Sequence, residues 1–295
     1  MTEKKKNIML VPVDFSEISL NALDHAAQVA KHFDNELVLL YIVEEYLITT
    51  IFKFGSNSDD KTQMAREQYL PELEELAKQT NEKYGVVCKT EVRVGRIYKT
   101  VVETATEYGC DCIIMGTHGA SGAARIIGSN ASRVINYSTV PVIVVKSQKW
   151  PNAYKNIVFP LDLSIQSKQK VKMAIHLAKS YNAIIHIIYN KDSDEFLNNK
   201  MVANLRQVEN IFVENGIEYT VKEVDESVSD FAVESLKYAE YSQADLIMIM
   251  TQSEDKDFTE YLIDTYAQRI VNAEGTVPVM CVNPSRSGFK SEFVI

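Results

Sequence analysis

Hydrophobic and polar positions follow two patterns that alternate along the chain. Residues 36–43 and 183–189 are apolar almost throughout, which is typical of parallel strands buried on both faces. Between such runs, apolar residues recur every three or four positions, as at Leu20, Leu23 and Ala27, and this spacing predicts helices with one buried face. The alternation of strands with helices predicts an α/β protein built from βαβ units.

The same order of segments occurs twice in the chain. Both copies begin with an apolar run that ends in Pro-x-Asp-x-Ser, and the second copy is one residue shorter. The matched pairs are residues 6–16 with 155–164, 111–115 with 245–249, and 131–145 with 267–282. Two halves with one order of elements indicate a duplication.

Each half is expected to contain five strands. Right-handed βαβ crossovers then give two tandem doubly wound parallel five-stranded sheets. The halves join in a polar stretch at residues 146–155, so the predicted domains are residues 1–148 and 149–295. Because this link is short, we expect the halves to pack side by side as a pseudo-dimer.

The segment at residues 45–64 fits neither pattern, and the tail at residues 285–295 also lacks periodicity. The first part of residues 45–64 is apolar, and residues 55–60 are typical of a loop. The segment is either a lid or contact surface, or a packed surface loop.

The composition limits the function classes. Apolar residues make up 46% and charged residues 24%, which is ordinary for a globular protein. The net charge of −9 argues against nucleic acid as a partner, because phosphates need a basic surface. No apolar stretch approaches the roughly 20 residues that span a bilayer, and residues 1–14 do not resemble a secretory leader. We therefore expect no membrane association and a cytoplasmic location.

Candidate ligand contacts lie at the predicted carboxyl ends of strands in the first half. In an open parallel sheet, ligands bind beyond these ends, near the point where the strand order reverses. The candidates are Pro12, Val13 and Asp14 after the first strand, Val43 at the end of the second, and Met115 and Gly116 at the end of the fourth.

A glycine-rich segment follows the fourth strand and leads into a helix. Gly116, Gly119 and Gly128 allow backbone amides to approach a phosphate, and Ser129 offers a hydroxyl at the positive end of that helix. Glycines also serve tight turns and helix caps, so the segment alone is weak support for phosphate binding. His118 either contacts a phosphate, orders the loop or is solvated.

Together with Pro-Val-Asp-x-Ser and the final Val-Pro-Val-Ile-Val-Val, this segment resembles the universal stress protein family. The family pattern is Gly-x2-Gly-x9-Gly-(Ser/Thr), and the resemblance covers the chain as a tandem pair. It implies a fold like that of the adenine-nucleotide α-hydrolases. It also implies that the last strands of the two domains, residues 140–145 and 277–282, pair edge to edge.

The resemblance implies ATP as the ligand, with or without Mg²⁺, and AMP or ADP as alternatives. Asp14 would lie near the ribose and the backbone of Val43 near adenine. The triphosphate contacts would be Gly116, Gly119, Gly128, Ser129 and Asn130. This chain has eight residues between Gly119 and Gly128 where the family pattern has nine, so the loop either adopts a different turn or is too narrow for a triphosphate.

The second half departs further from the family pattern. Met250 stands where the first half has Gly116, and Asp264 stands where it has Gly128. The β-carbon of Met250 blocks close backbone approach, and the acidic residues 254–260 repel phosphate, so we expect no nucleotide there. Asp162 corresponds to Asp14, and its expected role is to cap the following helix, an alternative that applies to Asp14 as well.

No catalytic group or metal site stands out. The five histidines are scattered, and no nucleophile and base are paired. We therefore expect a regulatory protein of the stress response that binds an adenine nucleotide in its first half and has at most a slow ATPase activity. The alternative is a nucleotide-free interaction or scaffold protein of the same fold. A homodimer and an unknown protein partner are also expected.

Overall fold

A computed structural model describes residues 6–44, 58–117, 128–146, 153–161, 167–225, 230–251, 265–273 and 277–283. The chain divides into two compact units, Met1–Lys149 (unit 1) and Trp150–Val294 (unit 2). Each unit contains five parallel strands connected by helices. The doubly wound α/β fold expected from the repeated pattern is confirmed for both halves.

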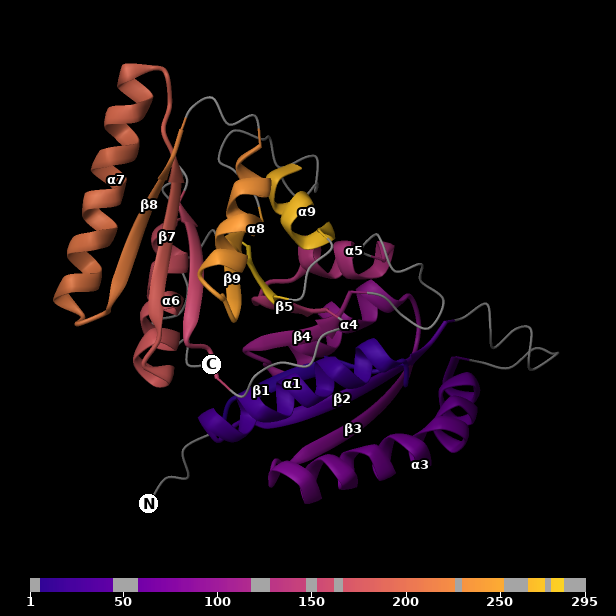
Figure 1. Ribbon diagram of the computed structural model, residues 1–295. Helices are drawn as coiled ribbons and strands as arrows, with labels where there is room; N and C mark the ends of the chain where they lie inside the picture. The colour runs from indigo at the N-terminus through magenta and orange to yellow at the C-terminus, as the bar shows by residue number, and fades with distance from the viewer. Residues whose placement is uncertain are drawn as a thin grey trace. The chain divides into compact units, whose positions relative to one another are not determined.

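The strands of unit 1 lie in the order β3-β2-β1-β4-β5, and all neighbours are parallel (Figure 1). The chain runs outward from the central strand to β3 and then returns to the other side. The order therefore reverses between β1 and β4, which is where such sheets bind ligands. The strands are β1 (Ile8–Pro12), β2 (Glu36–Val43), β3 (Cys88–Val94), β4 (Cys112–Gly116) and β5 (Val142–Val145).

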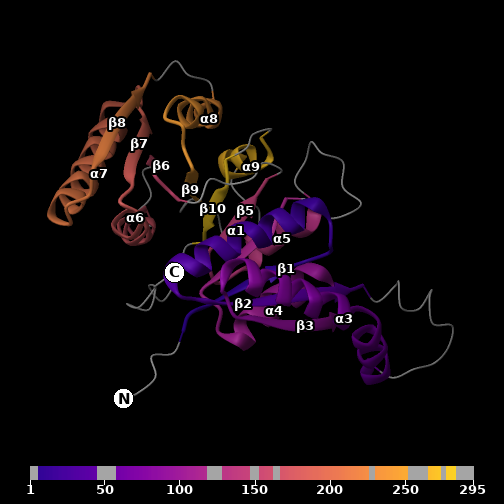
Figure 2. The same cartoon turned by 60° about the horizontal axis from the view of Figure 1, so that its bottom comes forward.

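The helices in the described part of unit 1 pack in two pairs. They are α1 (Glu17–Phe33), α3 (Ser58–Tyr84), α4 (Ile97–Tyr108) and α5 (Ser129–Tyr137). Helix α1 packs beside α3, and α4 packs beside α5. Because right-handed crossovers reverse direction at β1, the two pairs cover opposite faces of the strands. Helix α3 lies along β3 in both views (Figures 1 and 2).

Helix α3 begins at Ser58, inside the segment that the sequence predicts to be a loop. The prediction is wrong at residues 58–60. The helix that begins here runs to Tyr84 and packs along β3, and this tertiary packing, which local sequence does not show, decides its conformation. Residues 45–57 lie outside the described part of the chain, so the alternative of a lid or a packed loop stays a prediction.

Unit 2 repeats the arrangement with strand order β8-β7-β6-β9-β10. Its strands are β6 (Asn156–Leu161), β7 (Ile184–Asn190), β8 (Tyr219–Val224), β9 (Leu246–Met250) and β10 (Val279–Val282). Its helices are α6 (Ser167–Tyr181), α7 (Glu195–Glu214), α8 (Phe231–Tyr241) and α9 (Thr265–Asn272). No helix in the described ranges is both long enough and apolar enough to cross a bilayer.

One repeated aspartate has a structural role in both units. The Asp111 carboxylate accepts a hydrogen bond from the Ile8 amide at 3.2 Å, at the start of β1. The Asp245 carboxylate accepts from the Lys155 and Asn156 amides at 2.8 and 2.9 Å, at the start of β6. The match between residues 111–115 and 245–249 therefore reflects a shared way of tying the fourth strand of a unit to its first strand.

Candidate functional site

The carboxyl end of β1 is rigidly held in unit 1. The Val13 amide donates to the Leu40 carbonyl at 2.9 Å, and Val13 is buried at 4% exposure. Pro12, the last residue of β1, is partly exposed. The backbone then turns sharply, because Phe15 has a φ of 60° in the left-handed region, which is uncommon for a residue with a β-carbon. The backbone conformation at Phe15 thus fixes how the chain passes from Asp14 into α1.

Asp14 supports the start of α1 without being its cap. The N-cap is Ser16, whose side chain accepts from the Ser19 amide. The Asp14 carboxylate accepts from the Ser16 amide at 3.1 Å and from the Ser16 hydroxyl at 2.5 Å, both at Oδ1. The capping role that the sequence offers as an alternative for Asp14 therefore belongs to Ser16. The hydrogen bonds hold the Asp14 carboxylate at the strand end.

Three aromatic rings contact one another close to the end of β1, and the sequence did not point to them. Tyr41 contacts Phe15 with ring centroids 5.3 Å apart and Tyr69 with centroids 4.6 Å apart. Burial, followed by the nearby Tyr69, Asp14 and Glu72, raises the pKa of Tyr41 to about 12. Like any neutral tyrosine, Tyr41 can donate a hydrogen bond through its hydroxyl.

Val43 ends β2 next to the start of α4. Its side chain is buried at 5% exposure, and its carbonyl accepts from the Gly95 amide at 3.0 Å. A carbonyl oxygen has two lone pairs, so the contact with adenine that the resemblance implies would use the second one.

At the end of β4, a glycine is required by packing. Met115 and Gly116 are both buried. A β-carbon at Gly116 would lie 2.5 Å from Ile18 Cγ2 and 3.2 Å from the Ile18 backbone carbonyl carbon, so α1 leaves no room for one. The structure thus gives Gly116 a packing reason that the sequence analysis did not consider. A nucleotide is not needed to explain this glycine.

The glycine-rich segment has its two ends joined by a hydrogen bond. The Gly128 amide donates to the Thr117 carbonyl at 2.9 Å, and the Thr117 amide donates to the Val145 carbonyl at 3.2 Å. Residues 118–127, including the candidates His118 and Gly119, lie outside the described residues, so their roles and the effect of the shorter spacing stay predictions.

Helix α5 starts directly after these joined ends. Gly128 is its N-cap, with φ −58° and ψ 144°, and no side chain caps the helix there. Ser129 is exposed and Asn130 is partly exposed. Among the described residues no side-chain cap is seen at the start of α5, and an anion is favourable at this end of the helix.

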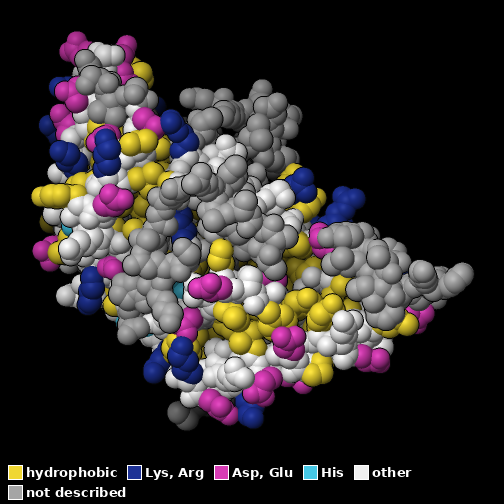
Figure 3. All heavy atoms as spheres, turned by 45° about the vertical axis from the view of Figure 1, so that its right-hand side comes forward, with side chains coloured by type: hydrophobic (Ala, Val, Ile, Leu, Met, Phe, Trp, Pro, Cys, Tyr) yellow, Lys and Arg dark blue, Asp and Glu magenta, His cyan; other side chains and the backbone are white. Residues whose placement is uncertain are grey.

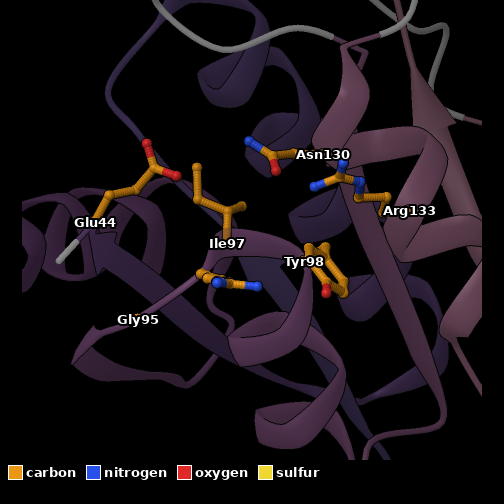
Figure 4. Close-up of a pocket in the computed structure, with 7 residues that line it drawn as sticks. Glu44, Gly95, Ile97, Tyr98, Asn130 and Arg133 are labelled. Carbon is orange, nitrogen blue, oxygen red and sulfur yellow. The ribbon is translucent and has the colours of Figure 1, made fainter. Parts of the chain in front are cut away.

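A pocket of about 350 Å³ lies between the start of α4 and the start of α5 (Figure 4). Figure 4 shows Asn130, Arg133 and Tyr98 gathered on one side of this pocket and Glu44 on the other. The lining residues are Glu44, Gly95, Arg96, Ile97, Tyr98, Asn130 and Arg133. Of the residues predicted from the sequence, the pocket contains Asn130, and it adjoins Val43 through Glu44.

Arg96 and Arg133 give the pocket a positive character that the sequence analysis missed. Among the described residues, neither guanidinium is within ion-pair distance of a carboxylate. The Arg133 guanidinium lies over the Tyr98 ring, 5.3 Å from its centroid, and Tyr98 lies 5.5 Å from the Tyr137 ring. This stacking holds Arg133 in place without neutralising its charge. The face in Figure 3 mixes acidic with basic side chains, and its described residues form no broad basic surface.

Unit 2 has different side chains at the equivalent places. Met250, at the position of Gly116, is buried at 5% exposure. Lys170 stands eleven residues before the end of α6, where α1 has the buried Ala22. It is 1% exposed, and its ammonium donates to the Pro160 carbonyl at 2.5 Å and lies 4.2 Å from the centroid of the Phe159 ring. A long buried side chain thus reaches the carboxyl end of β6.

An ion pair lies at the start of α8 in unit 2. Asp230 is the N-cap of α8, and its carboxylate accepts from the Val233 amide at 3.4 Å and from the Arg269 guanidinium at 2.5 Å. Tyr266 stacks on Phe231, with ring centroids 5.3 Å apart, and its hydroxyl lies 3.1 Å from the Ser235 hydroxyl. Residues 162–166 and 252–264 lie outside the described residues, so the predictions for Asp162 and for the acidic segment stay predictions.

No group of three or more His, Cys, Asp or Glu side chains in the described ranges is arranged to hold a metal ion. The Mg²⁺ that the resemblance allows beside a bound nucleotide therefore stays a prediction.

Comparison with known proteins gives one family. The model described as "Universal stress protein family" matches residues 6–146 and again residues 153–283. Universal stress protein MJ0531 of Methanocaldococcus jannaschii is 35% identical over 142 residues, which are 48% of this chain and 82% of that protein. Universal stress protein YxiE of Bacillus subtilis is 31% identical over 147 residues, 48% of this chain and 99% of that protein.

Among solved structures, a universal stress protein from Archaeoglobus fulgidus has the same fold. The TM-score is 0.76 at 21% identity, and the match covers 96% of this chain and all of that one. The family match in both halves agrees with the duplication inferred from the sequence.

Proposed function

This chain belongs to the universal stress protein family, and from that premise we propose that unit 1 binds an adenine nucleotide while unit 2 does not. ATP is the proposed ligand, with ADP and AMP as alternatives. Binding in unit 1 would regulate the conformation or the partner choice of the protein during stress. A cytoplasmic location, a homodimer and a protein partner are parts of the same proposal.

One observation carries this proposal: the uncapped start of α5 lies next to the reversal point of the unit 1 strand order. Gly128 is held there by its bond to Thr117, with Ser129 and Asn130 following it. Backbone amides at a helix start are a ready site for phosphate. Asp14 and Val43, at the ends of β1 and β2, would then hold the ribose and adenine.

The buried Lys170 and Met250 support the absence of a nucleotide site in unit 2. Lys170 stands at the position of Ala22 and Met250 at the position of Gly116, so both positions carry a larger side chain in unit 2. These two buried side chains are the difference in packing at the strand ends that supports the proposal for unit 2.

The packing of Gly116 against Ile18 favours a second candidate function. Because packing alone accounts for this glycine, a scaffold protein of the same fold that binds no nucleotide would also need it. A binding measurement decides between the two candidates.

Calorimetric titration with ATP, ADP and AMP tests the proposal, and Gly128→Asp is the sharpest variant. The backbone at Gly128 suits any residue, and Asp is a favoured N-cap, so α5 should remain stable. The new carboxylate occupies the amides and repels phosphate. We expect one nucleotide per chain in the wild type and at least a tenfold loss of affinity in the variant, about 1.4 kcal/mol.

The outcomes separate the two candidate functions. If none of the three nucleotides gives a heat of binding, and no nucleotide copurifies with the protein, the scaffold function is the remaining candidate. Equal affinity in Gly128→Asp would place the nucleotide away from α5. If the wild type releases phosphate from ATP faster than Gly128→Asp does, the protein also has a slow ATPase activity.

A further inference from the structure

The start of α4 in unit 1 carries an unfavourable residue. Arg96 is the N-cap, and its side chain makes no capping hydrogen bond because a guanidinium has no acceptor. Its positive charge also lies at the positive end of the helix dipole. An arginine here costs stability unless an anion binds beside it.

Unit 2 has an anion of its own at the equivalent position. Asp230 lies 15 residues before Asp245, as Arg96 lies 15 residues before Asp111, and both are N-caps. The Asp230 carboxylate serves two groups, the Val233 amide of α8 and the guanidinium of Arg269. Arg269 is the fifth residue of α9, as Arg133 is the fifth residue of α5. One carboxylate therefore joins the start of α8 to an arginine in the second half of α9.

Unit 1 has the arginine of this arrangement without the carboxylate. Arg133 is stacked over Tyr98, and Arg96 adds a second cation where unit 2 has Asp230. Between them lies the pocket of about 350 Å³. We infer that this pocket is an anion site in which a phosphoryl group, bound by Arg96 and Arg133, takes the place of the Asp230 carboxylate.

A phosphoryl group suits the groups that line the pocket. Guanidinium groups bind phosphate oxygens through paired hydrogen bonds, and the Asn130 side chain can donate a further one. We expect the first amides of α4 to donate as well, as the Val233 amide does to Asp230 in unit 2. Glu44 lies across the pocket and keeps the anion on the arginine side.

The phosphoryl group belongs either to the proposed nucleotide or to a separate phosphate. Asn130 is shared with the predicted nucleotide contacts, so a nucleotide bound in unit 1 could extend its phosphates into the pocket. Only in that case does the inference rest on the proposed function. The anion site itself needs no adenine.

Pyrophosphate is the probe that tests the anion site. We expect saturable binding to the full chain by calorimetry, and at least a tenfold loss of affinity in Arg96→Gln and in Arg133→Gln. Arg269→Gln is the matched control in unit 2 and should bind as the wild type does. The inference is overturned if the wild type shows no saturable binding, or if both pocket variants bind as tightly as the wild type.

Arg96→Asp separates loss of the site from loss of the fold. This substitution copies the arrangement in unit 2, so its carboxylate should cap α4 and pair with Arg133. We expect pyrophosphate binding to disappear while the thermal midpoint stays the same or rises by a few degrees. An Arg96→Asp variant that is folded and still binds pyrophosphate would overturn the inference.

ATP titrations of the same variants distinguish this inference from the proposed function. If ATP does not bind but pyrophosphate does, the anion site stands and the nucleotide proposal fails. If ATP binds equally to the wild type and to Arg96→Gln while pyrophosphate binds to neither, the nucleotide proposal stands and the anion site fails. Displacement of pyrophosphate by ATP would identify the nucleotide as the source of the phosphoryl group, and binding of both together would identify a separate phosphate.

Discussion

Unit 1 and unit 2 share one order of strands and helices, yet they differ where a ligand would bind. Unit 2 fills the strand ends with Lys170 and Met250 and joins Asp230 to Arg269. Unit 1 has Ala22 and Gly116 at the first two positions and Arg96 at the third. The difference teaches that the duplicated fold accommodates two different sets of side chains at these positions. In unit 2, the Lys170 ammonium and the Asp230 carboxylate bind groups of the protein itself. In unit 1, Ala22 and Arg96 stand at these positions, and we propose that they leave space and positive charge for a ligand.

Shortening Lys170 should have the largest effect on this comparison. Lys170→Ala gives unit 2 the side chain of Ala22, leaves a cavity and removes the donor to the Pro160 carbonyl. We expect a loss of about 2–4 kcal/mol in the free energy of unfolding, measured with urea. Lys170→Met keeps most of the volume and should lose less, and the exposed Lys172→Ala is the control. Wild-type stability in Lys170→Ala would mean that the buried side chain is not part of the packing.

Adding a β-carbon at Gly116 tests the packing reason for this glycine. Gly116→Ala forces the new methyl group against Ile18, and we expect it to reduce the free energy of unfolding by about 1–3 kcal/mol. Removing the Ile18 side chain in a Gly116→Ala, Ile18→Ala double variant should relieve part of the clash with Cγ2. If Gly116→Ala were as stable as the wild type and had lost its nucleotide, the glycine would be required by the ligand instead.

The units should also differ in their response to acid. His25 in α1 is fully buried, and burial, only partly offset by Asp24, lowers its pKa to about 3. The unfolded chain binds a proton to this histidine below a pH of about 6.5, while the folded chain does not. Its contribution to stability is therefore complete above that pH and declines by about 1.4 kcal/mol per pH unit as the pH falls toward 3.

The equivalent of His25 in unit 2 is Met173, which does not titrate. His25→Met should therefore reduce the slope of unfolding free energy against pH between pH 6 and about 4.5, as measured by urea unfolding. An identical slope in the variant and the wild type would show that His25 takes up a proton in the folded protein.

Removing the charge of Asp230 should have the smallest effect. Asp230→Asn keeps an N-cap acceptor and loses the ion pair with Arg269, whose side chain is 59% exposed. We expect a loss of about 0.5 kcal/mol, seen as a small decrease in the thermal midpoint. A double-mutant cycle with Arg269→Gln measures the coupling directly, and a coupling of zero would mean that the pair does not stabilise the start of α8.

The sequence predicted the fold well because the strands are recognisable from the local pattern of apolar residues. The apolar runs at β2 and β7 and the repeated Pro-x-Asp-x-Ser segments needed no tertiary information. The start of α3 was missed because a helix that begins with polar residues looks locally like a loop. Tertiary packing decides its conformation.

The candidate site was only partly accessible from the sequence. Gly128, Ser129 and Asn130 could be named because a glycine before a helix has a local meaning. Arg96 could not, since nothing local distinguishes an arginine at the end of β3 from one on the surface. Its importance depends on Arg133, which lies 37 positions later in the chain and close by in space. The repeat held a usable clue, because aligning α4 with α8 pairs Arg96 with Asp230.

The central claim is that unit 1 holds a nucleotide and unit 2 does not, and a crystal structure of the full chain grown with ATP tests it most directly. The account predicts electron density for one nucleotide per chain, with its phosphates at the start of α5 and its ribose beside Asp14. A nucleotide bound at the ends of β6 and β9, with unit 1 empty, would contradict it.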